Sequence, residues 1–259
     1  MSWESVLVDG PATDVTPHQG EGLDLEVLYP GIADLGGDAG NIFYLCACLP
    51  GATLHQTHLG ERPYFMDHRP DFVFLGNMDA SNQERAAKDL APWKERLVEL
   101  ADDGVPILFT GAAAEILGEH VALDHGRAFD GLGIFPFTTT MHPISERIND
   151  FFVGTADGIE ILGWKSQFTE SFGDNTRSCF ARGTRGCGIN LGTDLEGFRR
   201  GGLVATWLLG PFLVANPVYT EHLIATMGVA HPQLAFEKVA RKAFERRIVE
   251  LRDTSRIAD

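Results

Sequence analysis

The first half of the chain alternates short apolar runs with segments of helical periodicity. The continuous apolar run DFVFLGN, residues 71–77, is expected of a strand buried on both faces of a parallel sheet. Residues 83–102 place apolar positions on one stripe at helical spacing and predict a single amphipathic helix. This alternation indicates βαβ units and an α/β fold, with a mainly parallel central sheet flanked by helices. The same pattern predicts further strands at residues 23–30, 53–59 and 106–110, and a short helix at residues 42–49.

After residue 119 the pattern changes to short β-rich pieces separated by Gly and Asp turns. These pieces, GLVATWLL among them, are expected to form antiparallel strands that extend or flank the central sheet. Residues 216–227 predict a helix with Asn216 as its N-cap and Pro217 at its first position. Residues 232–251 predict a helix whose polar face is rich in Lys, Arg and Glu. We expect it to pack on the domain as a solvated helix, with docking of a partner protein as the alternative.

The chain is therefore expected to have three parts. Residues 1–22 are polar, with prolines and glycines, and predict a loose lead-in. Residues 23–231 predict one domain, and residues 232–259 predict a C-terminal helix.

Composition and charge narrow the class of protein. The chain has 259 residues, of which 44% are hydrophobic and 22% charged, as in ordinary globular proteins. Its formal net charge of −15 argues against a nucleic acid or an anionic membrane as partner, because either would repel an acidic surface. The N-terminus has no basic region followed by an apolar one, and the longest apolar run, residues 203–215, is interrupted by Gly210 and Pro211. We expect a cytoplasmic protein without a membrane span.

The sequence predicts neither a metal site nor a bound cofactor. The nine histidines form no HExxH motif, and His55 and His58 would point to opposite faces of a strand. The cysteines form two loose pairs without zinc-knuckle spacing and are expected to be reduced structural thiols, namely Cys46 with Cys48 and Cys179 with Cys187.

The stretch PILFTGAAAEILGE, residues 106–119, has the shape of a nucleophile elbow. It combines a short apolar strand, a tight turn and the start of a helix, an arrangement that presents one reactive side chain above a sheet. At the apex stands Gly111, followed by three alanines. The pattern predicts the backbone of an elbow without its nucleophile.

Five segments, in chain order from about residue 23 to residue 227, resemble one enzyme family. The Tyr-Pro strand end and the Gly-Asp-x-Gly-Asn loop are matched by LYPGIADLGGDAGN. A Gly-rich loop ending in Gln is matched by DFVFLGNMDASNQ, and an elbow Cys-Gly-Gly-Tyr-Gln-x-Leu-Gly by PILFTGAAAEILG. The last matches are GLGIFPFTTT with ERINDFFVG, and ATWLLGPFLVANP. The chain thus resembles the cobyric-acid-synthase-type class I glutamine amidotransferases, and among them the GatD-type glutaminase subunits. The resemblance implies a flavodoxin-like α/β fold.

The positions that carry the family's chemistry differ in this chain. Glutaminase chemistry needs a thiolate nucleophile, a His that moves the proton, and backbone N–H groups aimed at the oxyanion. The resemblance places Gly111 at the nucleophile position and Leu209 at the His position, and Asn77 and Met78 replace glycines of the oxyanion loop. The family's Gly-Phe-Glu-x-His segment reads Gly-Trp-Lys-Ser-Gln at residues 163–167. We expect no catalytic residue, with Gly111 and Leu209 as vestigial positions.

Another residue is a poor substitute for the missing nucleophile. Thr110 precedes the apex, but a threonine nucleophile usually depends on a free α-amine. Cys179 or Cys187 would have to fold over the site, and neither has a His nearby in the sequence. Glutaminase activity is therefore predicted to be absent.

Candidate ligand-binding residues remain at Arg147, Asn77 and Gln83. The resemblance implies that Arg147 contacts a glutamine carboxylate through its guanidinium fork, with a surface salt bridge to Glu146 as the alternative. Gln83 is alternatively an ordinary first-turn helix residue. Asp38 and Asn41 are expected only to cap a turn and the following helix, with a part in the binding site as the alternative.

The resemblance also implies a partner. GatD-type subunits work with a Mur-ligase-like synthetase that activates a carboxyl group with ATP and consumes ammonia. We expect this chain to be a structural or regulatory subunit of such a complex in cell-wall precursor modification, with glutamine or a related small molecule as a candidate ligand. Two alternatives are a stand-alone binding or sensing protein that uses the crevice at the carboxyl ends of the strands, and an enzyme with different chemistry there.

Overall fold

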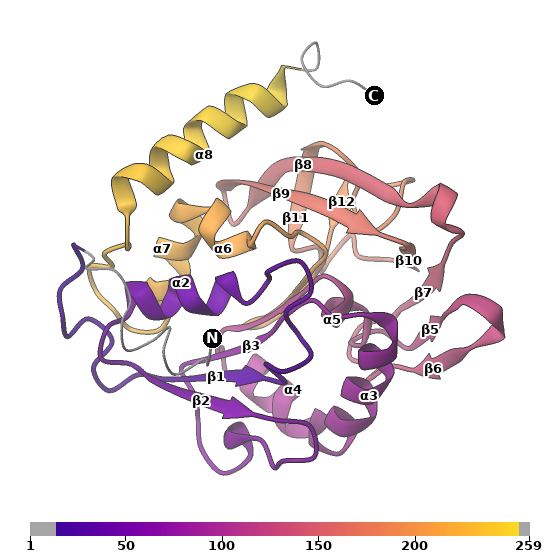
Figure 1. Cartoon of the computed structure of the whole chain (residues 1–259), viewed down its shortest axis with the longest axis horizontal. Coiled ribbons are helices and arrows are strands. Elements are labelled where there is room, and N and C mark those ends of the chain that lie inside the picture. Colours follow the sequence, from indigo (N-terminus) through magenta and orange to yellow (C-terminus); the bar gives the residue numbers. More distant parts are fainter. Residues whose placement is uncertain (1–13, 254–259) are drawn as a thin grey trace.

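A six-stranded sheet in the order β13-β14-β4-β3-β1-β2 forms the centre of the computed structural model, which describes residues 14–253 (Figure 1). Strands β14, β4, β3, β1 and β2 pair in parallel with one another in that order. Strand β13 pairs antiparallel with β14 at one edge of the sheet. The predicted α/β fold class is confirmed. Most of the predicted lead-in lies outside the described residues. The strand bounds are β1 Asp24–Leu28, β2 Thr53–Thr57, β3 Phe72–Leu75, β4 Ile107–Thr110, β13 Phe198–Arg200 and β14 Leu203–Thr206.

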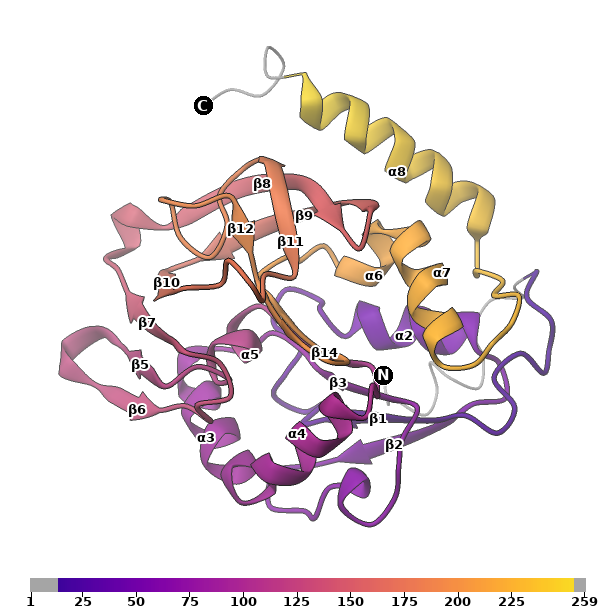
Figure 2. The ribbon, with the colours of Figure 1, turned by 180° about the vertical axis from the view of Figure 1, so that it is seen from behind.

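The sheet is buried on both faces. Successive residues of a strand point to opposite faces, so Phe72 and Phe74 of β3 pack in one core while Val73 and Leu75 pack in the other. Helices α3 (Ala80–Leu90) and α4 (Lys94–Asp102) cover the second face. The first face is covered by α2, α6 and α7, as Figure 2 shows from behind. Their bounds are Gly40–Cys48, Phe212–Ala215 and Pro217–Thr226.

The prediction of one helix over residues 83–102 is wrong. The chain forms α3, then a 3-10 turn at Ala91–Trp93, and then α4. Pro92 lies in the turn, has no N–H to donate, and its ring would clash with a carbonyl of the preceding helical turn. Helix α3 also begins earlier than predicted, because the Asp79 carboxylate accepts hydrogen bonds from the N–H groups of Ser81 and Asn82.

The second half adds two four-stranded sheets, in the orders β10-β7-β5-β6 and β12-β11-β8-β9. The prediction that all strands after residue 119 would be antiparallel is wrong for β14, which pairs in parallel with β4, and for β5, which pairs in parallel with β7. All four residues of β14 are buried, as its place inside the central sheet requires. The added strands are β5 His120–Ala122, β6 Ala128–Asp130, β7 Phe137–Met141, β8 Ile148–Ala156, β9 Ile159–Gln167, β10 Thr169–Gly173, β11 Ala181–Arg185 and β12 Leu195–Glu196.

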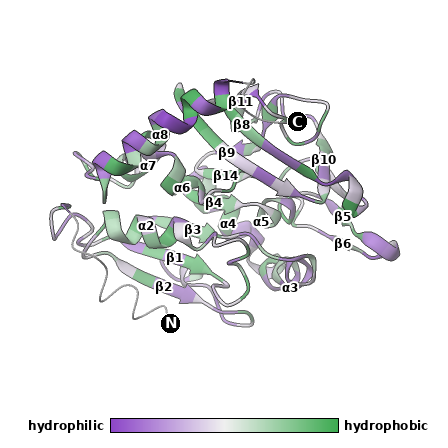
Figure 3. Ribbon diagram, turned by 45° about the horizontal axis from the view of Figure 1, so that its top comes forward, coloured by the Kyte–Doolittle hydropathy of each residue, from purple (hydrophilic) through white to green (hydrophobic). Residues whose placement is uncertain are grey.

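The C-terminal helix α8 (Glu237–Arg252) lies outside the body, across α6 and α7 and the sheet that contains β8 and β9. Only Ile248 and Leu251 of α8 are buried, whereas Val239 and Val249 are 70% and 68% exposed. Figure 3 shows hydrophilic and hydrophobic residues interleaved along this helix. It begins five residues later than predicted. Within residues 14–253 no helix is both long enough and apolar enough to cross a membrane.

Helix α7 begins at Pro217 with Asn216 at the N-cap position, as predicted. The Asn216 side chain makes no capping hydrogen bond. Its Oδ1 accepts from the Leu162 N–H at 2.8 Å, and its Nδ2 donates to the Leu162 carbonyl at 2.7 Å. The side chain therefore joins the α6–α7 segment to β9.

Candidate functional site

The elbow backbone is present at the carboxyl end of β4. The strand is fully buried, and it is followed by Gly111 with φ 58° and ψ −131° and then by the short helix α5 (Ala112–Glu115). The Gly111 N–H donates to the carbonyl of Thr206 in β14 at 2.8 Å, so the parallel ladder continues up to the turn. A positive φ favours glycine because a Cβ strains this conformation. The chain thus holds the sharp turn with a residue that has no side chain to present.

The side chain of Asn77 fills the space beside the turn. Its Oδ1 accepts a hydrogen bond from the Ala112 N–H at 2.9 Å. A Cβ built on Gly111 would lie 2.5 Å from Asn77 Oδ1 and 2.6 Å from its Cγ, far inside van der Waals contact. The amide nitrogen Nδ2 donates to the carbonyl of Leu35 at 3.3 Å. Asn77 therefore leaves no room for a side chain at position 111, and it accepts the hydrogen bond that the Ala112 N–H could otherwise donate to a ligand.

A buried carboxyl group holds the loop before α2 against the strand ends. Asp38 accepts hydrogen bonds from the Asn77 N–H and from Asn41 Nδ2, both at 2.8 Å, and from the Thr110 hydroxyl. Burial raises the pKa of Asp38 above its ordinary value, and these hydrogen bonds oppose the rise. The prediction that Asp38 and Asn41 only cap a local turn and helix is wrong, because Asn41 Oδ1 also accepts from the Leu213 N–H at 2.7 Å. Thr110 is fully buried and donates to Asp38, so its hydroxyl is unsuited to attack a substrate.

A crevice of about 230 Å³ lies beside Gly111. Gly111 and Leu209, the two positions predicted to be vestigial, both line it, as do the predicted ligand-binding residues Asn77 and Gln83. Leu209 is held by backbone hydrogen bonds to Trp164 of β9, at 2.8 and 3.0 Å. Among the described residues that line the crevice there is no Cys, His, Lys or Arg. The remaining lining residues are Leu35, Met78, Asp79, Ala80, Ala112, Glu115, Met141, Ser166, Gln167, Phe168, Thr169 and Trp207.

Glu115 is a buried carboxyl group at one wall of the crevice. It accepts hydrogen bonds from Gln83 Nε2 at 2.7 Å, from the indole N–H of Trp207 at 3.3 Å, and from the Thr169 hydroxyl. Burial raises the pKa of Glu115 above its ordinary value. Gln83 also donates to the Ala112 carbonyl at 2.8 Å, so both N–H groups of its amide are used inside the protein. The predicted ligand-binding role of Gln83 thus lacks a free N–H donor.

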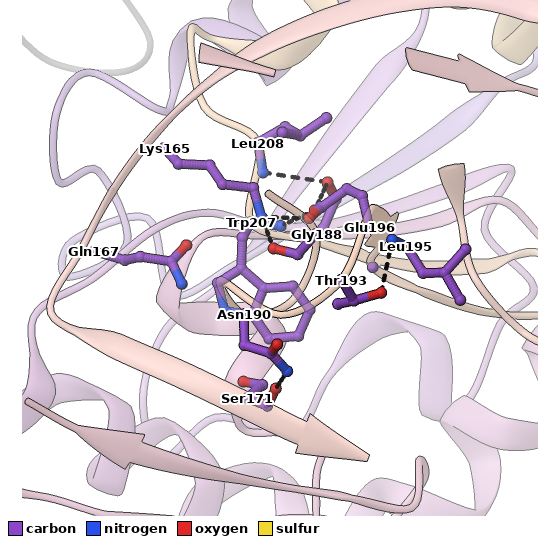
Figure 4. Close-up of polar contacts among 12 residues, drawn as sticks. Lys165, Gln167, Ser171, Gly188, Asn190, Thr193, Leu195, Glu196, Trp207 and Leu208 are labelled. Carbon is purple, nitrogen blue, oxygen red and sulfur yellow. Dashed lines mark hydrogen bonds and ion pairs between the residues drawn. The ribbon is translucent and has the colours of Figure 1, made fainter. Parts of the chain in front are cut away.

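An ion pair that the sequence did not reveal supports the Trp207 wall. Lys165 and Glu196 form this pair with no exposed surface, and Lys165 Nζ also donates to the Gly188 carbonyl at 2.5 Å. Glu196 Oε1 accepts from the backbone N–H of Trp207 at 2.8 Å, as Figure 4 shows. The same oxygen accepts from the Thr206 hydroxyl at 2.9 Å. A Lys inside the apolar strand piece IEILGWKS was the available signal, because a buried Lys requires a partner.

The structure does not bring Arg147 into the crevice lining. Arg147 is exposed, and its guanidinium carbon lies 5.8 Å from the centre of the Phe168 ring. Phe168 itself lines the crevice. Among the described residues Glu146 approaches His142, at 3.6 Å, rather than Arg147. Arg147 therefore stands beside the crevice, and contact with a ligand carboxylate remains a prediction.

The cysteines do not supply a replacement nucleophile in the crevice. Neither Cys179 nor Cys187 is among its lining residues, and burial raises the pKa of Cys187. Burial likewise raises the pKa of Cys46 to about 12 and that of Cys48 to about 11, so both stay protonated thiols at neutral pH. Within residues 14–253 no three His, Cys, Asp or Glu side chains are grouped so as to hold a metal ion.

Comparison with known proteins shows distant homology to GatD. No protein-family profile matches the chain. The GatD subunit of lipid II isoglutaminyl synthase (glutamine-hydrolyzing) from Staphylococcus aureus is 28% identical over 155 residues, which are 60% of this chain and 62% of that protein. The chain thus spans less than two thirds of the length of that relative. The subunit of the same name from Streptococcus pneumoniae is 24% identical over 214 residues, or 81% of each protein.

One solved structure shares the fold. PurLQS from Thermotoga maritima matches with a TM-score of 0.52 at 12% identity, over 87% of this chain and 99% of that chain. The crystal structure of a glutamine amidotransferase matches with a TM-score of 0.49 at 14% identity, over 78% of this chain and 98% of that chain.

Proposed function

We propose that this chain is a glutamine amidotransferase-like subunit that lacks glutaminase activity. In this proposal it assembles with a Mur-ligase-like, ATP-dependent synthetase that amidates a cell-wall precursor. The distant homology to a protein named as a subunit of lipid II isoglutaminyl synthase supports both the subunit character and the link to lipid II. We further assign the chain to the cobyric-acid-synthase-type class I amidotransferases, on the order of its five matching segments.

The arrangement of Asn77 and Gly111 carries the proposal that glutaminase activity is lost. A nucleophile at position 111 would collide with the Asn77 carboxamide, and the Ala112 N–H, placed to bind an oxyanion, already donates to Asn77 Oδ1. At the His position Leu209 offers no base. Three requirements of the chemistry are therefore unmet at once, while the scaffold around them is intact.

The subunit then acts through its surface. The candidate docking elements are α7 and α8, because α8 buries only Ile248 and Leu251 and leaves Val239 and Val249 exposed. We also propose that residues 23–231 form the amidotransferase-like domain and that residues 232–259 add the C-terminal helix. The formal charge of −15 favours a synthetase with a complementary basic patch, which would set orientation and association rate. The synthetase would take ammonia from solution.

Co-expression with the Mur-ligase-like synthetase of the same genome tests the proposal. We expect the two chains to elute as one peak in size-exclusion chromatography at moderate salt. The complex should amidate lipid II with ATP and ammonium, but not with ATP and glutamine. Val239→Asp should weaken assembly. Leu191→Asp is the control and should not weaken it, because Leu191 is about as exposed as Val239 but lies far from α8 in the sequence. Two separate peaks, with the isolated chain monodisperse, would contradict the partner role, and glutamine-dependent amidation would contradict the loss of activity.

A further inference from the structure

One polar atom at the crevice has no partner. Gln167, the last residue of β9, is only 9% exposed, and its Oε1 has no hydrogen-bond partner among the described residues. Its Nε2 donates to the carbonyl of Thr169 at 2.7 Å. Because a carbonyl can only accept, this bond fixes which end of the amide carries the nitrogen. Gln167 therefore offers an unused acceptor, and Figure 4 shows its side chain extending toward the Trp207 indole.

Most of the crevice surface around this acceptor is apolar, although polar side chains such as Ser166 and Thr169 also line it. Gln167 and Trp207 line the same crevice of about 230 Å³, together with Met141, Phe168 and Leu209. A buried acceptor left unpaired is unfavourable, and a ligand that supplies a donor relieves it. The apolar side chains favour a ligand whose remaining surface is apolar, and the methionine and the aromatic rings favour an aromatic one.

The charged groups at the crevice argue against an anionic ligand. The only ionisable side chains among the lining residues are Asp79 and Glu115, and both are acidic. The Glu115 carboxyl group already accepts hydrogen bonds from Gln83, Thr169 and Trp207. The Asp79 carboxylate accepts hydrogen bonds from backbone N–H groups in the first turn of α3. Among the described residues no cation lines the crevice, and Arg147 lies outside the lining, at the Phe168 ring, so no positive charge inside the crevice would receive a carboxylate.

We propose that the crevice binds a small, neutral and mainly apolar ligand that donates one N–H or O–H hydrogen bond to Gln167 Oε1. Free glutamine, with its carboxylate, does not fit this description. The inference goes beyond the proposed function and does not rest on it, because a chain that failed to join a synthetase would still have this crevice.

Isothermal titration of the full chain with three probes tests the proposal. Indole has an aromatic body and one N–H, benzofuran is its counterpart with oxygen in place of N–H, and indole-3-carboxylate adds an anion. We expect indole to bind about two- to tenfold more tightly than benzofuran, the range of one net hydrogen bond. Indole-3-carboxylate should bind more weakly than indole. Equal binding of indole and benzofuran, or no binding of either at millimolar concentration, would overturn the proposal.

Variants place the site. Gln167→Met removes the acceptor and should make indole and benzofuran bind equally, whereas Gln167→Glu keeps an acceptor and should preserve the preference for indole. Gln233→Met, the same change at an exposed glutamine of another region, is the matched control and should leave the preference unchanged. Leu209→Trp should fill the crevice and abolish binding of both probes. Unchanged binding in that variant would place the probes elsewhere and overturn the proposal, even if Gln167→Met failed to fold.

Discussion

The Asn77 carboxamide occupies the space that any side chain at Gly111 would need. A Cβ on Gly111 would lie 2.5 Å from Asn77 Oδ1, and the same oxygen accepts the Ala112 N–H at 2.9 Å. Residues separated by 34 positions thus depend on each other: the glycine makes room for the amide, and the amide satisfies the N–H that the turn exposes. The elbow is a stable structural element in this form.

This dependence predicts energetic coupling. Gly111→Ala should lower the free energy of unfolding by about 1–3 kcal/mol, because it adds a clash to a positive φ. In the Asn77→Gly background the same change should cost less, since only the backbone strain remains. Urea unfolding of the two single variants and the double variant measures the coupling. Gly36→Ala is the control for backbone strain alone, because Gly36 has φ 76° and open space around it. If the two changes in the free energy of unfolding, at positions 77 and 111, simply added in the double variant, the proposed clash would be contradicted.

A thiol at the apex should be accessible only after Asn77 is removed. We expect Gly111→Cys to react slowly with iodoacetamide, and the double variant with Asn77→Gly to react faster, because the amide no longer crowds the turn. Peptide mapping by mass spectrometry distinguishes this thiol from the native cysteines. Gly111→Cys with Leu209→His should still release no ammonia from glutamine, since Asn77 keeps the Ala112 N–H. Ammonia release from that pair alone would show that Asn77 does not block the site.

The buried Lys165–Glu196 pair should be costly to break from one side. Lys165→Met leaves an unpaired carboxylate under the crevice and should lower the free energy of unfolding by about 3–5 kcal/mol. Adding Glu196→Gln should recover part of this loss. Lys88→Met is the control, because the Lys88–Glu84 pair is exposed to solvent and should contribute little to stability. Chemical denaturation gives all four values, and equal effects at positions 165 and 88 would contradict the role of burial.

Glu115 should make stability fall as pH rises. Burial raises its pKa in the folded state above the ordinary value of 4.5, so between 4.5 and the raised pKa the unfolded chain loses a proton that the folded chain keeps. Folding then becomes less favourable by up to about 1.4 kcal/mol per pH unit. Urea unfolding from pH 4.5 to 7.5 should therefore show Glu115→Gln gaining stability relative to the unsubstituted protein as pH increases. A shift in the opposite direction would mean that the hydrogen bonds from Thr169, Gln83 and Trp207 outweigh burial.

Local signals in the sequence predicted the parts of the fold that depend on neighbouring residues. The continuous apolar run of β3 and the strand–glycine–helix pattern at Gly111 both lie where expected. Pro92 was a visible signal for the helix break, but the apolar stripe running through it favoured one helix. The parallel pairing of β14 with β4 was not visible, because it joins residues almost 100 positions apart.

The site depended even more on distant contacts. Asn77 was recognised as a replaced glycine, but its contact with Gly111 depends on how two loops meet. The Lys165–Glu196 pair and the free acceptor on Gln167 likewise arise from packing between strands, which residue spacing does not encode.

The most direct test of the proposed loss of glutaminase activity is a measurement of ammonia released from glutamine by the purified chain, alone and with the co-expressed synthetase. We predict no release above the blank in either case, because no Cys or His among residues 14–253 lines the crevice and the Ala112 N–H is occupied. Release above the blank would contradict this prediction if a single change at the crevice, such as Ser166→Ala, abolished it. That result would also identify a replacement nucleophile.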